Sequence, residues 1–217
     1  GAELYVEHWA PAQVRHPYSV VLIHGGYGQG SDWLSTPDGR RGWASMLLEQ
    51  GYKVYVVDRP GQGRNPHYPW VHGLYDAQAP TFERVAASVK SAPWPGNGDA
   101  ADPAVAQVAA AMGQPMAINA ITMDLWRSRG ALLLDDIGAS ILITHGDGVI
   151  FAWMTALERP ALVKGVVAVE QSQQSVQVLT PQQLAKLAGV PISIVSVPSA
   201  IRLPALKEKM AAEVYSQ

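Results

Sequence analysis

The chain of 217 residues contains no cysteine, so it has neither a disulfide nor a thiolate ligand for a metal ion. Its apolar runs all fall short of the roughly 18 residues that a membrane span needs. Charged residues make up only 16% of the chain, the net charge is −2, and like charges form no blocks. This charge pattern argues against nucleic acid as a main partner. None of these features separates secreted, periplasmic and cytoplasmic proteins.

The chain does have apolar content, at 48% of its residues, which is enough to build the core of one large domain. Apolar runs of strand length alternate with helical spacing, which indicates βαβ units, a mostly parallel sheet and a single α/β domain over residues 1–217. Residues 3–9 are expected to form an edge strand. The other strands are expected at 18–23, 53–57, 140–144, 164–169 and 191–197, and the helices at 43–50, 103–112, 122–137, 149–157, 181–187 and 203–215.

The middle of the chain, residues 66–121, interrupts this rhythm with frequent prolines and two tryptophans. A long irregular stretch inside a compact domain is typical of a lid or binding insertion. Its aromatic and methionine content suits the covering of an apolar ligand. The alternative is an ordinary packed excursion. Asp102 and Pro103 form the expected start of a short helix within it, as N-cap and first helical residue.

The segment Thr144-His145-Gly146-Asp147-Gly148 has the strand–turn–helix context of a nucleophile elbow, in which small residues flank a nucleophile. Gly146 occupies the central position, where a serine is expected. A second glycine-rich turn, residues 24–30, follows another buried strand. Such a turn can aim backbone N–H groups at an anion, and it can equally be a tight strand-to-helix connection.

In this order and spacing, the motifs resemble the α/β-hydrolase fold, and in particular serine esterases whose triad acid is a glutamate. The resemblance extends from residue 19 to about residue 197. It rests on Val20-Val21-Leu22-Ile23-His24-Gly25-Gly26, on Val56-Val57-Asp58-Arg59-Pro60-Gly61-Gln62-Gly63, on Trp94-Pro95-Gly96-Asn97-Gly98 with Asp102-Pro103-Ala104, and on residues 142–170.

The resemblance implies a catalytic site at the carboxyl ends of the strands. Gly146 takes the nucleophile position, and Glu170, which ends an apolar strand, takes the position of the triad acid. The oxyanion hole would use the backbone N–H of Asp147 and that of Gly26 or Tyr27.

The substrate pocket is expected at His24, Gly25 and His145. The resemblance also implies that His145 packs under the elbow and that His24 braces the oxyanion loop. The remaining histidines form no metal-ligand pattern, so neither a metal nor another cofactor is expected.

The sequence departs from the esterase pattern twice. Gly146 has no nucleophilic side chain, and all six histidines precede Glu170, whereas the general base should follow the acid in the chain. Three hypotheses remain open. Gly146 can be an engineered replacement of serine in an esterase whose histidine lies outside this sequence. The chain can be a natural pseudo-hydrolase that binds ligands. The pocket can also run non-hydrolytic proton transfer with Glu170, His145 and Asp147.

We therefore expect an esterase-like hydrolase scaffold for small or medium apolar esters, amides or lactones, inactive as a covalent esterase because of Gly146. The expected partner is a small-molecule ester or carbonyl compound, with no nucleic acid and no membrane span. A sheet without the usual last strand would expose an edge, so pairing with a second copy of the chain is also expected.

Overall fold

A six-stranded sheet forms the centre of the computed structural model, which describes residues 2–36, 39–76, 80–89, 96–171 and 174–196. The strand order is β1-β3-β2-β4-β5-β6; β1 runs antiparallel to β3, and all other neighbours are parallel. The strands are β1 (Tyr5–Trp9), β2 (Ser19–Ile23), β3 (Val54–Asp58), β4 (Ser140–His145), β5 (Val163–Val169) and β6 (Ile192–Val195).

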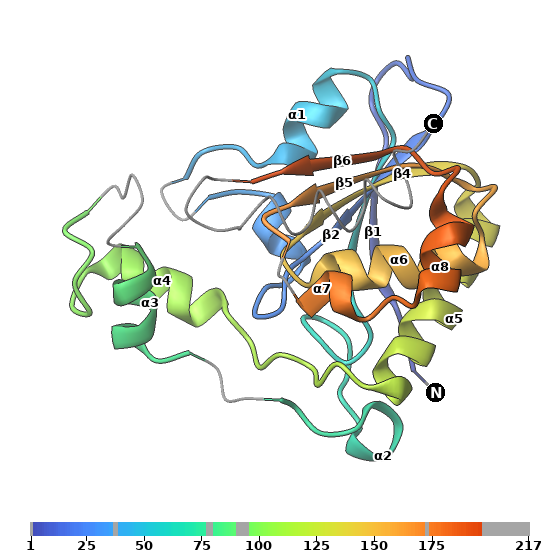
Figure 1. Cartoon of the computed structure of the whole chain (residues 1–217). Coiled ribbons are helices and arrows are strands. Elements are labelled where there is room, and N and C mark those ends of the chain that lie inside the picture. Colours follow the sequence, from blue (N-terminus) through green and yellow to red (C-terminus); the bar gives the residue numbers. More distant parts are fainter. Residues whose placement is uncertain (1, 37–38, 77–79, 90–95, 172–173, 197–217) are drawn as a thin grey trace.

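Helices cover both faces of the sheet, as Figure 1 shows: α1 lies over one face, and α5, α6 and α8 lie over the other. α3 and α4 lie beside the sheet, and α2 lies apart from it. The helices are η1 (Gly30–Trp33), α1 (Trp43–Glu49), α2 (Pro69–His72), α3 (Phe82–Val89), α4 (Pro103–Ala111), α5 (Ala120–Ile137), α6 (Gly148–Glu158), α7 (Gln174–Gln177) and α8 (Pro181–Leu187). No helix among the described residues is both long and apolar enough to cross a bilayer.

Two apolar cores, one on each face, hold these layers together. The larger core joins α5, α6 and α8 to the sheet around Trp126, Phe151 and Trp153, which are all almost fully buried. The smaller core packs η1 and α1 against Val20, Leu22 and the inner face of β3. Because β2 is buried along its whole length, its sequence is a continuous apolar run rather than an alternating one.

The expected strands and the long helices are confirmed to within one or two residues, including the edge position of β1. Asp102 caps α4 as expected, with its carboxylate accepting the Ala104 N–H at 2.9 Å. The expected helix at 203–215 lies outside the described residues.

The irregular middle contains more regular structure than the prolines suggested. α2 and α3 both lie in it, in addition to the expected α4. α3 and α4 pack on each other through a small core of their own, which contains Val85, Ala86, Val105 and Ala109. The role of residues 66–121 as a lid stays a prediction.

The sheet changes winding direction between β2 and β4. The chain moves from β2 outward to β3, and later from β4 outward to β5 and β6, on the opposite side. β2 and β4 are paired in register, with Ile23 beside Thr144, so the two glycine-rich turns leave the sheet side by side. A crevice at the carboxyl ends of strands, at such a switch point, is where open α/β sheets bind ligands.

Candidate active site

The turn between β4 and α6 has the backbone geometry of a nucleophile elbow. Gly146 lies at φ +50°, a conformation that side chains with a Cβ rarely adopt. Its N–H donates to the carbonyl of Val169 at 2.9 Å, which ties the turn to the end of β5. Among the described residues, a Cβ built on Gly146 would meet only the Gly25 Cα, at 3.9 Å, so this part of the chain leaves space where a nucleophilic side chain would lie.

Glycine is favoured at two other positions of the site because the turn after β2 and the elbow approach each other closely there. A Cβ on Gly148 would lie 2.3 Å from the carbonyl oxygen of His24, because the first turn of α6 passes directly over the end of β2. A Cβ on Gly25 would lie 2.8 Å from Nδ1 of His145. The two turns therefore touch, and only glycine allows them to do so.

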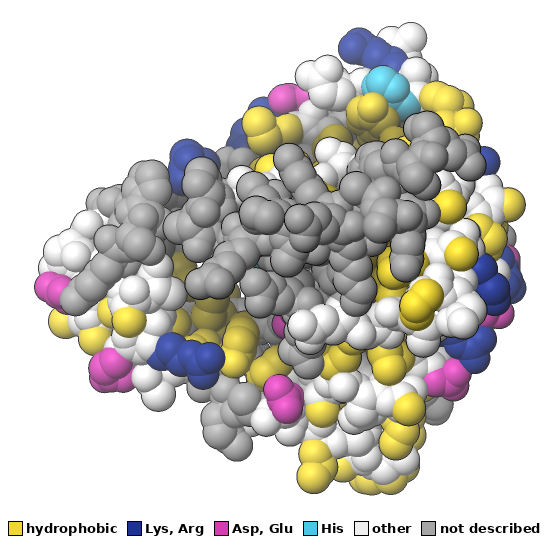
Figure 2. Space-filling model, viewed as in Figure 1, with side chains coloured by type: hydrophobic (Ala, Val, Ile, Leu, Met, Phe, Trp, Pro, Cys, Tyr) yellow, Lys and Arg dark blue, Asp and Glu magenta, His cyan; other side chains and the backbone are white. Residues whose placement is uncertain are grey.

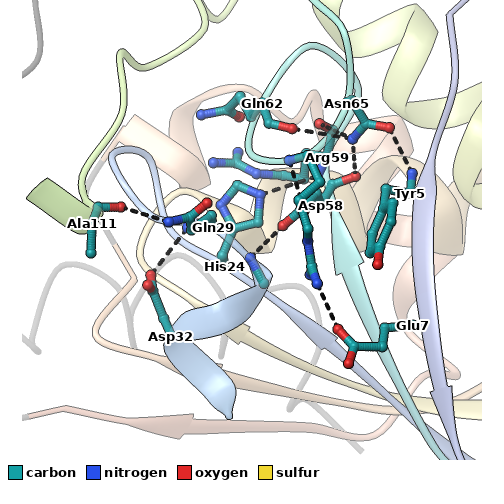
Figure 3. Close-up of polar contacts among 12 residues, drawn as sticks. Tyr5, Glu7, His24, Gln29, Asp32, Asp58, Arg59, Gln62, Asn65 and Ala111 are labelled. Carbon is teal, nitrogen blue, oxygen red and sulfur yellow. Dashed lines mark hydrogen bonds and ion pairs between the residues drawn. The ribbon is translucent and has the colours of Figure 1, made fainter. Parts of the chain in front are cut away.

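The loop after β2 rests on a buried polar cluster, part of which Figure 3 shows. The Arg59 N–H donates to Nε2 of His24 at 3.1 Å, so Nδ1 carries the proton and donates to the Gly25 carbonyl at 2.8 Å. Burial, with a contribution from the nearby Arg59 charge, lowers the pKa of His24 to about 3. His24 is therefore neutral at physiological pH, which this donor–acceptor arrangement requires.

Asp58, fully buried at the end of β3, fixes the beginning of η1. Its carboxylate accepts the Gly30 N–H and is paired with Arg64 at 2.6 Å; Arg64 also pairs with Glu7 of β1 at 2.6 Å (Figure 3). Burial favours the neutral acid, but the hydrogen bonds from Arg64 and Gly30 outweigh it and lower the pKa of Asp58. One carboxylate thus links β3, η1 and the edge strand.

A cavity of about 580 Å³ opens at the elbow, within the size range of small-molecule sites. One wall is the glycine loop and η1, the floor is the elbow, and the far wall is the last turns of α4. Its lining residues are Gly25, Gly26, Tyr27, Gly28, Ser31, Asp32, Ser35, Thr36, Gln107, Val108, Ala111, Met112, His145, Gly146 and Asp147.

Two carboxyl groups and one imidazole line this cavity, those of Asp32, Asp147 and His145. Partial removal from water raises the pKa of the Asp32 carboxyl. The hydrogen bond that it accepts from the Gln29 N–H favours the charged form and opposes this shift, but it does not cancel it. The Asp147 carboxylate lies beside Gly26, since a Cβ on that glycine would be 2.9 Å from its Oδ2. The α4 side contributes the apolar Val108, Ala111 and Met112.

Glu170 lies at the end of β5, one strand over from the elbow. Its Oε2 is 3.7 Å from Nε2 of His145, and both side chains are partly exposed. Glu170 is the one described residue other than glycine with a positive φ, +47°, and its N–H donates to the Val195 carbonyl at 2.8 Å. Such a conformation costs on the order of 1–3 kcal/mol and is concentrated at functional sites.

The structure brings most of the expected site residues together. Gly25, Gly26, Tyr27, His145, Gly146 and Asp147 all line the cavity, and Glu170 adjoins it through His145.

Two expectations require correction. His24 is not in the pocket, because its ring is 1% exposed and lies beneath the loop, against Arg59. His145 does not pack under the elbow, because its side chain is half exposed on the cavity wall.

The sequence did not predict the contributions of η1 and α4 to the cavity. Asp32 follows the glycine loop directly, so its position after the motif could have suggested it. The contribution of α4 had no such signal, since it depends on how a distant segment returns to the elbow. Among the described residues, no three His, Asp or Glu side chains are grouped to hold a metal ion.

Comparison with known proteins finds a curated relative and many similar folds. No family model matches the chain. A probable secreted lipase, phiG, from a fungus (strain ATCC 74256) is 35% identical over 176 residues, which are 77% of this chain and 48% of the lipase. The chain thus spans about half the length of the curated relative it matches.

Among solved structures, a novel bacterial esterase has a TM-score of 0.71 at 22% identity, over 97% of this chain and 70% of that one. The thioesterase domain from the curacin biosynthetic pathway has a TM-score of 0.58 at 14% identity. The match covers 99% of this chain and 86% of that domain. These likenesses, together with the strand order, show that the chain has the α/β-hydrolase fold.

Proposed function

We propose that the cavity at Gly146 is the ester site of a hydrolase-type protein, and that this chain binds esters there without forming a covalent acyl intermediate. The substrates would be small or medium apolar esters, amides or lactones. The observation that carries the proposal is Gly146 itself: it has the left-handed backbone of a nucleophile elbow, it lies at the floor of the cavity, and the described residues leave room for a side chain there.

The surroundings of Gly146 support a carbonyl ligand. Gly26, Tyr27 and Asp147, the N-cap of α6, line one end of the cavity, where a carbonyl oxygen could accept from their backbone N–H groups. Val108, Ala111 and Met112 offer an apolar surface for the acyl or alcohol chain. The relative named as a lipase and the similar bacterial esterase agree with an ester as the ligand.

Because residue 146 is glycine, the chain has no nucleophilic side chain at the elbow for covalent acyl transfer. Loss of a triad nucleophile costs on the order of a million-fold in rate in a well-studied serine protease. Backbone donors, by contrast, are unaffected by a serine-to-glycine difference. We therefore expect ligand binding and transition-state electrostatics to survive where acyl transfer does not.

The experiment introduces a nucleophile that needs no histidine. Because the chain has no cysteine, Gly146→Cys provides a single thiol, which is intrinsically reactive without a paired base. We expect p-nitrophenyl butyrate to acylate this thiol with a rate that saturates with ester concentration. Intact-mass spectrometry follows the bound butyryl group, and absorbance follows p-nitrophenolate.

Gly138→Cys is the matched control. Gly138 also has a positive φ, +82°, and open space around its Cβ position, but it precedes β4, at the opposite end of that strand from the elbow. The Gly146→Cys thiol should react at least about tenfold faster, since one oxyanion donor is typically worth about a hundredfold. Equal rates in the two variants, with a linear dependence on ester concentration, would refute the ester site.

One contact favours a second candidate, proton transfer on a carbonyl compound. The 3.7 Å approach of Glu170 to His145 would orient the imidazole on the cavity wall as an acid or base. Turnover of a carbonyl substrate by the unmodified protein, lost in Glu170→Gln, would support this function; no turnover would leave ester binding as the function of the site.

A further inference from the structure

The carbonyl groups of Gly25 and Gly26, in the glycine-rich turn after β2, accept hydrogen bonds from buried side chains that do not line the cavity. The Gly25 oxygen accepts from His24 Nδ1, from Arg59 Nη2 at 2.5 Å and from the Gly28 N–H at 3.2 Å. The Gly26 oxygen accepts from Gln62 Nε2 at 2.8 Å. Arg59 and Gln62 both come from the turn after β3. This turn therefore holds two successive peptide groups of the glycine-rich turn after β2.

The direction of these carbonyls fixes the direction of the N–H groups. In a planar trans peptide the C=O and the following N–H point in opposite directions, and no described peptide bond is cis. Holding the oxygens of Gly25 and Gly26 inward therefore turns the N–H groups of Gly26 and Tyr27 outward, to the face that lines the cavity. Within the described part of the chain, neither N–H has an acceptor.

The side chains of Arg59 and Gln62, which hold these carbonyls, are themselves buried. Arg59 is 1% exposed and lies 4.8 Å from the centre of the Trp126 ring. Burial lowers its pKa to about 10, and the Asp147 carboxylate opposes that shift, so the guanidinium remains charged at neutral pH. Gln62 is also buried, and its own backbone is bound to Arg59 and Asn65.

We infer that Gln62 and Arg59 are positioning residues for the anion hole: they orient the Gly26 and Tyr27 N–H groups toward a carbonyl oxygen that becomes negative during acyl transfer. The inference rests on the proposed ester site. It assigns a role to two side chains that do not line the cavity, and the motif of residues 56–63, which contains both, indicates no role for either.

The test uses Gln62→Met in the Gly146→Cys background. Methionine keeps the length and volume of glutamine but has no N–H to donate, so the Gly26 peptide loses its anchor. We expect the rate of acylation by p-nitrophenyl butyrate at saturating ester to fall about tenfold or more, with the half-saturating concentration changed less than threefold. Alkylation by iodoacetamide, which forms no oxyanion, should be unchanged.

Gln29→Met is the matched control, because Gln29 lies in the same loop but its amide donates to the Ala111 carbonyl instead. Unchanged acylation in Gln62→Met, or a fall in acylation matched by an equal fall in alkylation, would overturn the inference. Gln62→Glu, which replaces the donor by an acceptor in the same shape, repeats the test if the methionine variant does not fold. Failure of the ester site itself would show earlier, as equal acylation of the Gly146→Cys and Gly138→Cys thiols.

Discussion

Three positions around the elbow are occupied by glycine, and two different constraints on the backbone favour it there. Gly25 and Gly148 have no room for a Cβ, because the two turns pass within contact of each other. At Gly146 the described residues leave room for a Cβ, and the obstacle that they show to a side chain is the positive φ. We therefore expect that a nucleophilic side chain can be introduced at position 146 at the cost of local backbone strain, whereas substitution at the other two glycines would push the turns apart.

His24 makes the stability of the protein sensitive to acid. Its pKa of about 3 in the folded state lies below the 6.5 of an unperturbed histidine, so between these pH values the unfolded chain binds a proton that the folded chain does not. The free energy of unfolding should therefore fall as the pH drops below about 6.5, by about 1.4 kcal/mol per pH unit at most for this one group. Urea denaturation between pH 7.5 and 5 measures the effect.

His72 adds to this acid sensitivity, because burial lowers its pKa as well. His24→Asn, which keeps a donor near the position of Nδ1, should flatten the pH dependence. A free energy of unfolding in the unmodified protein that stays constant from pH 7.5 to 5 would contradict the burial of neutral His24.

At the residue level, the sequence predicted what depends on local motifs. The elbow, the glycine loop and the strand-end position of Glu170 were all recognisable from their neighbours in the chain. The sequence could not show that His24 faces inward or that His145 faces the cavity. Those orientations depend on Arg59 and on the contact between two turns that are more than a hundred residues apart.

At the level of elements, α5 and α6 pack closely through one small residue. A Cβ on Gly130 of α5 would lie 1.8 Å from Oγ1 and 2.9 Å from Cβ of Thr155 on α6. Gly130→Ala should therefore destabilise the protein by about 1–3 kcal/mol, as overpacking does, although alanine is the better helix former by about 1 kcal/mol. Chemical denaturation measures the change.

Thr155→Ala provides the test of this cause, since it removes the Oγ1 that the new methyl group would meet. The double variant should recover part of the loss seen with Gly130→Ala alone. A stabilising Gly130→Ala would show that the two helices can separate without cost, against the packing described here.

The sequence located elements well where their apolar pattern is strong, as in β2, β4 and α5. It was less informative for α3, because the apolar face of that helix packs on α4 and not on the sheet. Prolines in residues 66–121 indicated irregular structure, but Pro103 begins a helix, and Pro69 occupies the first position of α2. The same residue type thus marks breaks and helix starts alike.

At the scale of the whole molecule, apolar side chains remain exposed near α2. Trp70 is 82% exposed and Leu74 is 74% exposed, and Figure 2 shows hydrophobic side chains where Figure 1 places α2. This surface lies apart from the cavity lining. The account of ester binding therefore depends on the switch point between β2 and β4 and not on this surface.

Chemical-shift mapping of the unmodified protein tests the ester site most directly. Methyl hexanoate would be titrated into protein labelled with 15N, and the backbone amide shifts would be followed to saturation. We predict saturable shifts at Gly26, Tyr27, Met112 and Asp147, with the amide of Gly138 unchanged. Shifts that do not saturate, or that gather away from the cavity, would contradict the claim that Gly146 lies at the floor of an ester-binding site.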